Sequence, residues 1–152
     1  MAMKIAILED NLERKAAMLD CLQDKFYQFE KKFFDNPADM IDFLKDHLQD
    51  TIAISLDHDL ELIPAPEGKA TDPGTGREVA DFLAQKSPSC PVIIHTSNST
   101  AASGMEMVLQ EANWKTFRVC PCGDLDWIAD QWIRTLRQAI VRTMAQPRKN
   151  PV

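Results

Sequence analysis

The amino-acid sequence predicts a single α/β domain built on a doubly wound, parallel, five-stranded sheet. Short apolar runs of strand length alternate along the chain with longer segments in which apolar residues recur every three or four positions. This alternation is typical of parallel strands joined by right-handed helical crossovers. The 152 residues leave room for one domain, expected at 1–145 with a flexible C-terminal tail at 146–152. We expect the strand order 2-1-3-4-5, which is common at this size.

The strands are recognised as apolar runs bounded by polar residues. The run that begins at Thr51 is almost continuously apolar, as expected for a strand covered on both faces. The run at Lys31 begins with charged residues, which favours a position at the edge of the sheet. We expect the five strands at Lys4–Leu8, Lys31–Asp35, Thr51–Leu56, Pro91–His95 and Thr116–Val119.

Helices are expected after each strand, because apolar residues there follow helical spacing. The second helix carries the clearest start signal, an Asn36 cap followed by Pro37 in the first turn. The last helix carries the longest apolar stripe, formed by Ile128, Trp132, Leu136 and Ile140. We expect the five helices at about Leu12–Phe26, after Asn36-Pro37, at Arg77–Gln85, after Asn98 or Ser99, and after Asp124.

A segment rich in proline and glycine separates the third strand from the third helix. It runs from Glu61 to Gly76, whereas a routine strand-to-helix connection has about 2 to 6 residues. Long loops of this kind in compact domains commonly serve as lids or binding loops. Since this one leaves a strand that ends in acidic residues, we expect it to cover a crevice there.

Composition limits the classes of function that fit the chain. The net charge of −6 and pI near 5.0 argue against a broad nucleic-acid-binding face. No apolar run approaches the roughly 20 residues that cross a bilayer, and the N-terminus lacks a secretory apolar region. We therefore expect a cytoplasmic protein without a membrane partner. Its cysteines are then expected to be reduced and structural: Cys21, Cys90, Cys120 and Cys122.

Acidic residues end two of the predicted strands. Glu9 and Asp10 follow the first strand, while Asp57 and Asp59 follow the third. In the expected strand order these ends are neighbours, so the carboxylates would repel one another unless a cation lies between them. A site for Mg²⁺ formed by Glu9, Asp10 and Asp57 is the leading interpretation. The alternative is that these acids only cap a helix and shape a turn.

Two histidines lie at the same edge of the predicted sheet. His95 ends the fourth strand, and His58 separates the two acids of the third. Either histidine could transfer a proton to or from a phosphoester, or simply donate a hydrogen bond to a carboxylate. We assign Asp57, His95 and His58 as candidate catalytic residues.

Polar residues around these acids and histidines are the candidates for binding a substrate. Hydroxyl and amide groups at the start of the fourth helix suit a phosphate group, although they also suit an ordinary helix cap. The guanidinium of Arg77 could reach a bound phosphate, and Asp59 could orient a ligand or water. The candidate substrate-binding residues are therefore Asp59, Thr96, Ser97, Asn98 and Arg77.

These residues resemble the receiver domain of bacterial response regulators over roughly Lys4–Arg142. Receivers place two acids after the first strand, as in Glu9-Asp10. They place a phospho-accepting aspartate at the end of the third strand, matching Asp57, and a hydroxyl residue at the end of the fourth, matching Thr96. Their fifth strand ends in a lysine followed by proline. Here Cys120 precedes the proline, so the resemblance argues against ordinary phosphorelay switching.

Two short motifs look more similar to a divergent receiver-like family proposed to process cyclic phosphates. Its Asp-His-Asp motif matches the residues from Asp57 to Asp59, and its His-x-x-Asn motif matches those from His95 to Asn98. That family also lacks the lysine. The resemblance implies a metal-dependent domain that acts on a phosphoester, with a phosphate-containing small molecule or a nucleotide end as its ligand.

Other interpretations remain open. The first is a non-enzymatic signalling module that binds a protein partner, or a second copy of itself, through the last strand and helix. A second is a Toprim-like nucleic-acid enzyme, since Glu9 and the Asp57-x-Asp59 pair are similar to Toprim acids, although Asp10 stands where Toprim usually has glycine. A haloacid-dehalogenase phosphatase is rejected, because that family carries Asp-x-Asp on its first strand.

Overall fold

The computed structural model describes residues 2–145, and the predicted tail at 146–152 lies outside them. Five parallel strands form one sheet in the order β2-β1-β3-β4-β5, so the predicted fold class and strand order are confirmed. The strands are β1 (Lys4–Leu8), β2 (Glu30–Phe34), β3 (Thr51–Leu56), β4 (Val92–His95) and β5 (Thr116–Val119). Strand β2 begins and ends one residue earlier than predicted, and β4 begins one residue later. Strand β2 lies at an edge of the sheet, as expected.

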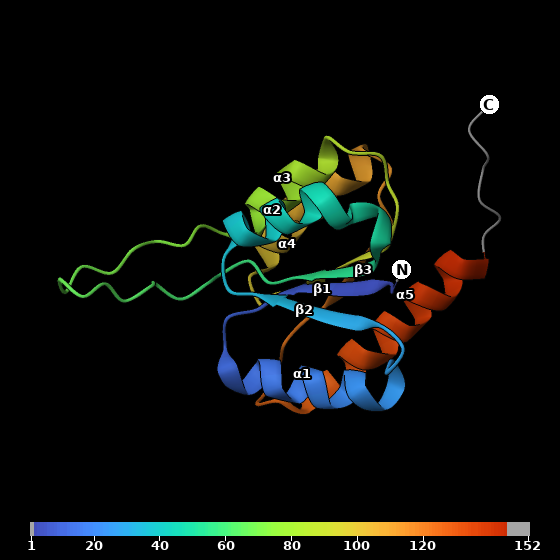
Figure 1. Cartoon of the computed structure of the whole chain (residues 1–152), viewed down its shortest axis with the longest axis horizontal. Helices are drawn as coiled ribbons and strands as arrows, with labels where there is room; N and C mark the ends of the chain where they lie inside the picture. Colours follow the sequence, from blue (N-terminus) through green and yellow to red (C-terminus); the bar gives the residue numbers. More distant parts are fainter. Residues whose placement is uncertain (1, 146–152) are drawn as a thin grey trace.

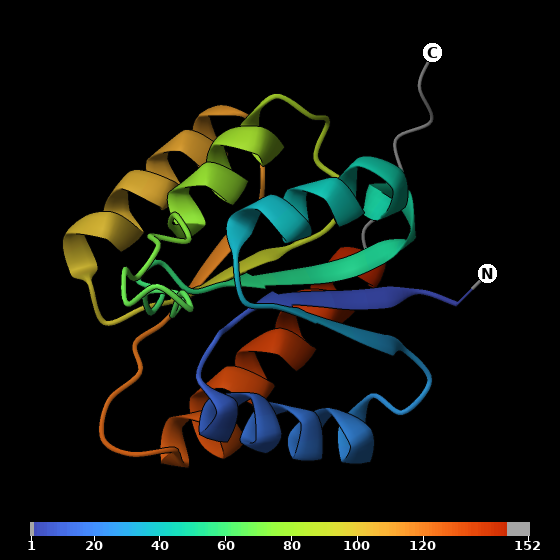
Figure 2. The same cartoon turned by 60° about the vertical axis from the view of Figure 1, so that its left-hand side comes forward.

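The helices cover both faces of the sheet (Figures 1 and 2). One face carries α2 (Pro37–His47), α3 (Gly76–Ala84) and α4 (Ser99–Glu111), while the other carries α1 (Leu12–Lys25) and α5 (Ile133–Ala145). A short 3-10 turn, η1 (Leu48–Asp50), precedes β3. The last helix departs from the prediction, because its first part is a π-helical segment, η2 (Ile128–Trp132). None of these helices is long and apolar enough to cross a bilayer.

Strand alternation divides the core into two apolar clusters. On β1, Ala6 and Leu8 face α2, α3 and α4, whereas Ile5 and Ile7 face α1 and α5. The predicted stripe on the last helix is buried, since each of its members is less than 10% exposed: Ile128, Trp132, Leu136 and Ile140. Both faces of the sheet are therefore closed, and the edge at the carboxyl ends of the strands is left for polar chemistry.

Helix α3 packs unusually close to the end of β3. The amide of Gly76 donates to the carbonyl of His58 over 3.1 Å. A Cβ at Gly76 would lie only 1.9 Å from the carbonyl oxygen of Asp57. Glycine is therefore required where α3 begins, because any side chain would push the helix away from the strand end.

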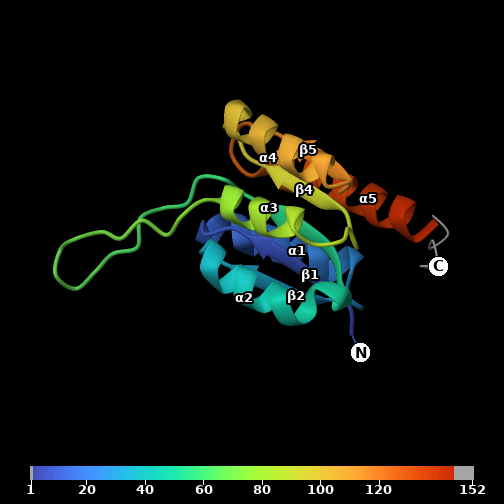
Figure 3. The same ribbon diagram turned by 90° about the horizontal axis from the view of Figure 1, so that it is seen from above.

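The long loop before α3 does not cover a crevice as expected. It extends outward from the body of the domain as two antiparallel arms (Figures 1 and 3), which are joined by an isolated bridge between Ile63 and Thr71. Most of the loop is exposed, and Leu62 is 58% exposed. Few of its side chains are apolar, so little hydrophobic burial is available to fold it back against the domain.

We expect Gly76→Ala to destabilise the domain by about 2 to 3 kcal/mol, because the added methyl group overlaps the Asp57 carbonyl. Urea unfolding measures this change. Gly104→Ala is the matched control, since Gly104 lies within α4 and a Cβ there meets only the flexible end of Arg77. Alanine at that position should be neutral or stabilising by up to about 1 kcal/mol. Equal stability of the Gly76→Ala variant and the wild type would contradict the role of this contact.

Candidate functional site

The strand register aligns three polar residues in one row. Leu8 pairs with Leu56, and Leu56 pairs with Ile94, so the residue that follows each of them lies at the same level. Those next residues are Glu9, Asp57 and His95. Since side chains alternate along a strand, the three point to the face of the sheet that α1 and α5 cover.

These three side chains form a buried cluster. Glu9 and His95 are fully buried, and Asp57 is 6% exposed. Glu9 Oε1 lies 3.4 Å from His95 Nε2, and neither atom has a hydrogen-bond partner among the described residues. Glu9 Oε2 accepts from the amide of Asn11 over 3.1 Å, which leaves Oε1 for another ligand.

A basic side chain from α1 reaches the two carboxylates. Arg14 Nη1 lies 3.5 Å from Glu9 Oε1 and 3.8 Å from Asp57 Oδ2. The guanidinium carbon is 5.4 Å from the centre of the Trp127 ring, a cation–π distance. The same indole stacks beside His95, with ring centres 6.0 Å apart. Arg14 therefore contacts both carboxylates and also packs against an aromatic ring.

A hydrogen-bond chain orients His95 from the core side. Trp132 Nε1 donates to Ser55 Oγ over 3.0 Å, and Ser55 Oγ lies 2.7 Å from His95 Nδ1. An indole N–H can only donate, so the Ser55 hydroxyl oxygen accepts from Trp132, and its second lone pair can accept from His95 Nδ1. A neutral His95 with its proton on Nδ1 has an Nε2 lone pair that faces Glu9 and can bind a cation.

Burial and charge shift the two carboxyl groups in opposite directions. Burial raises the pKa of Asp57 from 3.8 to about 6; the Glu9 charge adds to this rise, while His95, the His58 amide and Arg14 oppose it. Burial also raises the pKa of Glu9, but His95, the Asn11 amide and Arg14 outweigh burial and leave that pKa below its ordinary value. Asp57 is therefore the carboxylate that gains most from a further positive charge.

The donor set fits a divalent cation. Among residues 2–145, Glu9, Asp57 and His95 are the one group of this kind, with one ligand atom from each lying within 4.8 Å of the others. Two atoms that bind one ion at about 2.1 Å lie about 3.0 to 3.4 Å apart. The 3.4 Å between Glu9 Oε1 and His95 Nε2 matches that separation, and both atoms are buried without a hydrogen bond among the described residues.

The predicted metal ligand Asp10 lies outside this cluster. Its carboxylate Oδ2 accepts from the amide of Glu61 over 2.5 Å, which ties the beginning of the long loop to the end of β1. Asp10 alternates with Glu9 along the strand, and alternation directs it away from the row of three. Its assignment to a metal ion stays a prediction.

The second motif acid and its histidine form a separate pair at the surface. His58 Nδ1 lies 2.9 Å from Asp59 Oδ1, and Asn98 Nδ2 lies 3.4 Å from Asp59 Oδ2. The side chain of Asp59 is 64% exposed and that of His58 is 18% exposed. The backbone amide of His58 donates to Asp57 Oδ1 over 2.7 Å, so this pair adjoins the buried cluster.

The remaining predicted residues cap or support α4 and α3. Asn98 Oδ1 caps α4 by accepting from the Ala101 amide, and Thr96 Oγ1 accepts from the Asn98 amide. Ser97 is exposed. Arg77 pairs with Asp81 on its own helix over 2.9 Å. Within the described part of the chain no contact joins Arg77 to the row of three, and its role in binding stays a prediction.

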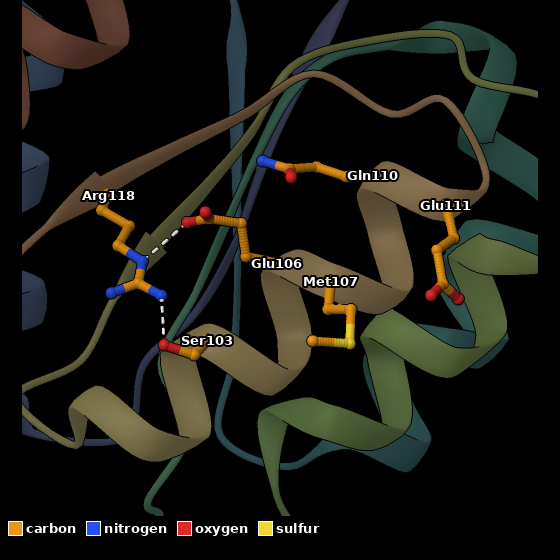
Figure 4. Close-up of a pocket in the computed structure, with 6 residues that line it drawn as sticks. All are labelled: Ser103, Glu106, Met107, Gln110, Glu111 and Arg118. Carbon is orange, nitrogen blue, oxygen red and sulfur yellow. Dashed lines mark hydrogen bonds and ion pairs between the residues drawn. The ribbon is translucent and has the colours of Figure 1, made fainter.

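A separate hollow of about 490 Å³ lies over α4 and β5 (Figure 4). Arg118 crosses it and bonds to Glu106 and Ser103 over 2.6 Å each. Met107 lies beside them and is 61% exposed. No residue of the acidic cluster lines this hollow, so it is a distinct surface feature.

The sequence analysis did not predict two residues of the site, Arg14 and Ser55. Arg14 lies in the first turn of a helix that follows directly on an acidic pair, a position from which a long side chain reaches the strand end. Ser55 is polar within the buried apolar strand β3, and a buried hydroxyl needs a partner. The other two contributors are Trp127 and Trp132, and the sequence predicted Trp132 only as a member of the buried stripe of the last helix.

The fold and the acidic strand ends define a receiver-like protein, and comparison with protein families supports this. The chain belongs to the cyclic-phosphate processing receiver domain family, which it matches over residues 5–111. The resemblance seen in the sequence is thereby confirmed, and it favours the receiver-like interpretation over the Toprim-like one. A search of curated proteins finds no match.

Solved structures show the same fold at low sequence identity. The phosphorylated cyanobacterial phytochrome response regulator RcpA is 14% identical, with a TM-score of 0.70, covering 97% of this chain and 100% of its own. The Mn²⁺-bound response regulator Rcp1 is 15% identical, with a TM-score of 0.66, covering 96% and 99%. The response regulator domain of Thermotoga maritima CheB is 14% identical, with a TM-score of 0.63, covering 97% and 100%.

We expect Ser55→Ala to destabilise the domain by about 2 to 4 kcal/mol, because it leaves both Trp132 Nε1 and His95 Nδ1 buried without a partner. Chemical unfolding followed by tryptophan fluorescence measures the loss. Ser103→Ala is the control, since its hydroxyl bonds to Arg118 at the surface and its removal should change stability by less than about 0.5 kcal/mol. A Ser55→Ala protein as stable as the wild type would refute the hydrogen-bond chain.

The raised pKa of Asp57 predicts a pH dependence of stability. Because the folded state holds this proton more tightly than the unfolded chain, the free energy of unfolding should fall as pH rises from about 4 to about 6. The shift corresponds to about 2 to 3 kcal/mol at neutral pH. Asp57→Asn should remove that fall and be more stable than the wild type at pH 7, as measured by urea unfolding without divalent cations.

Asp46→Asn is the control for this pH series. Asp46 lies exposed on α2, so its substitution should leave the stability profile unchanged. Identical profiles for the wild type and Asp57→Asn between pH 4 and 7 would show that Asp57 titrates as an ordinary aspartate.

Proposed function

We propose that this protein is a divalent-cation-dependent phosphoesterase that hydrolyses cyclic phosphates, with its active site at the carboxyl ends of β1, β3 and β4. One observation carries the proposal: Glu9 Oε1 and His95 Nε2 are buried, lack hydrogen bonds among the described residues and lie 3.4 Å apart, with Asp57 beside them. Membership of the cyclic-phosphate processing receiver domain family supports the substrate class.

Glu9, Asp57 and His95 are the proposed ligands of the cation. A bound divalent cation would neutralise the two carboxylates and polarise a phosphoryl oxygen. The Mg²⁺ expected from the sequence suits oxygen ligands, whereas the imidazole of His95 adds a donor that also suits transition metals. The similar response regulator Rcp1 is described in a Mn²⁺-bound form, and we therefore include Mn²⁺ beside Mg²⁺ as a candidate.

His58 is the proposed proton carrier. Its Nδ1 lies 2.9 Å from the Asp59 carboxylate, which would hold the ring with Nδ1 protonated and Nε2 open to the outside. His95, by contrast, is fully buried and bonded to Ser55 on its other nitrogen. The Nε2 of His58 is thus the better placed of the two to exchange a proton with a substrate at the surface.

The proposed reaction is hydrolysis of one ester bond in the phosphate ring. An oxygen of water forms a bond to phosphorus, and the bond from phosphorus to one ribose oxygen breaks. His58 Nε2 accepts the proton that the attacking water loses, and the released ribose oxygen takes a proton from solvent. His58 then returns its proton to solvent, so the product is a phosphomonoester. Asn98, which reaches the Asp59 carboxylate, would hold that acid against the His58 ring.

The assay that tests this proposal follows hydrolysis of a 2′,3′-cyclic nucleotide by phosphorus NMR, with Mg²⁺ or Mn²⁺ and with chelator. Asp57→Asn should lower cation-dependent turnover at least about 100-fold, because the cation loses a ligand. His58→Gln should lower it about 100-fold or more through loss of proton transfer. His47→Gln, on α2 and paired with Asp50, is the control and should keep full activity.

Turnover that persists in chelator, or in the Asp57→Asn variant, would contradict the proposal. So would the absence of both turnover and cation binding in the wild type.

A second candidate function is a non-enzymatic signalling module. The hollow over α4 and β5, together with the exposed Met107, Val141 and Met144, offers a surface for a protein partner or a second copy of the chain. Arg118 lies on the last strand, and Val141 and Met144 lie on the last helix, the two elements from which the sequence led us to expect partner binding; the rest of the hollow is lined by α4. Stable acyl-phosphate formation on Asp57 from a small phosphodonor, without turnover of cyclic phosphates, would favour this alternative.

A further inference from the structure

We propose that Arg14 is the residue that binds the phosphate group of the ligand. This inference rests on the proposed function, because it concerns the same site. The position at the end of β5, before Pro121, is occupied by the uncharged and exposed Cys120. The positive charge at this edge of the sheet instead comes from α1, through Arg14.

The guanidinium of Arg14 is close to Glu9 and Asp57, but its N–H groups make no hydrogen bonds to them. Its distances to Glu9 Oε1 and Asp57 Oδ2 are 3.5 Å and 3.8 Å, which are ion-pair distances rather than good hydrogen bonds. Among the described residues its side chain donates no hydrogen bond, although a guanidinium carries five N–H groups in a planar fork. With 29% of the side chain exposed, that fork is accessible to a ligand.

Trp127 lies beside this guanidinium. The indole ring lies against both the Arg14 guanidinium and the His95 imidazole. Its own Nε1 is buried without an acceptor among the described residues. A planar cation stacks on such a ring and presents its N–H groups at the edge, a geometry that matches the oxygens of a phosphate and that lysine cannot reproduce.

Binding of a cation would direct Arg14 toward an anion. In its absence the single positive charge of Arg14 offsets part of the charge on Glu9 and Asp57. A divalent cation held by these carboxylates would compete for them and repel the guanidinium, since like charges at such short range are unfavourable. Arg14 would then be released from the carboxylates and have its N–H groups available for phosphate oxygens.

Two affinities measured on Arg14→Gln test this assignment. Mn²⁺ binding is followed by the electron paramagnetic resonance signal of the free ion, and methyl phosphate binding to the Mn²⁺-saturated protein by calorimetry. Arg14→Gln should weaken methyl phosphate binding about 10- to 100-fold, the effect of losing charge-assisted hydrogen bonds. It should also tighten Mn²⁺ binding, because a competing positive charge is removed. Loss of a residue with a merely structural role would not weaken methyl phosphate binding and tighten Mn²⁺ binding at the same time.

Two further variants complete the experiment. Arg14→Lys keeps the charge without the planar fork and should bind methyl phosphate with an intermediate affinity. It also keeps the assignment testable if Arg14→Gln fails to fold. Arg134→Gln is the matched control, since Arg134 is exposed on α5 and pairs with Asp130. Both affinities should be unchanged in that variant.

The assignment is overturned if Arg14→Gln binds methyl phosphate as tightly as the wild type does, or if both affinities fall together. It is also overturned if the Mn²⁺-loaded wild type binds no methyl phosphate. Failure of the enzymatic proposal is a different result: the wild type would show the split in affinities and still leave cyclic nucleotides intact.

Discussion

The in-register pairing of β1, β3 and β4 is the constraint on which the site depends. Because each pair continues the same register, the first residue beyond each strand stands beside its neighbours, and alternation turns all three toward α1. A shift of one residue in any pair would replace Glu9 with Asp10, Asp57 with His58, or His95 with Thr96. The backbone ladder, rather than a flexible loop, therefore sets the distances among the acids and the imidazole.

Because helices cover both faces of the sheet, the charges on Glu9, Asp57 and His95 are shielded from water on the core side. Two tryptophans and the apolar residues of α1 and α5 exclude water from the core side, so the charges interact in a medium of low polarity. The same closure leaves Glu9 Oε1 and His95 Nε2 without partners, a cost that a bound ion would offset.

The fold could be predicted from the sequence because strand and helix periodicities recur with little ambiguity. The bounds of β2, β4, α1 and α3 differ from the prediction by one residue, and the last helix has a π-helical start. The candidate site could be predicted in part. The ends of the strands point to the acids and histidines. The sequence prediction nevertheless grouped Asp10 with Glu9, although side-chain alternation turns these two neighbours to opposite faces of the sheet. Arg14 and Ser55 escaped notice because their roles depend on tertiary contacts, with α1 folding over the acids and Trp132 approaching from the far end of the chain.

The two ends of the long loop are tied to the domain independently of its tip. The Glu61 amide bonds to Asp10 at one end, and Gly76 abuts the end of β3 at the other. The entropy of closing a loop grows only slowly with its length, by about 0.6 kcal/mol for each doubling. The intervening residues can therefore accept insertions, deletions or a grafted peptide while the edge at the strand ends keeps its shape. This makes the arm a suitable place to attach a label or an additional module.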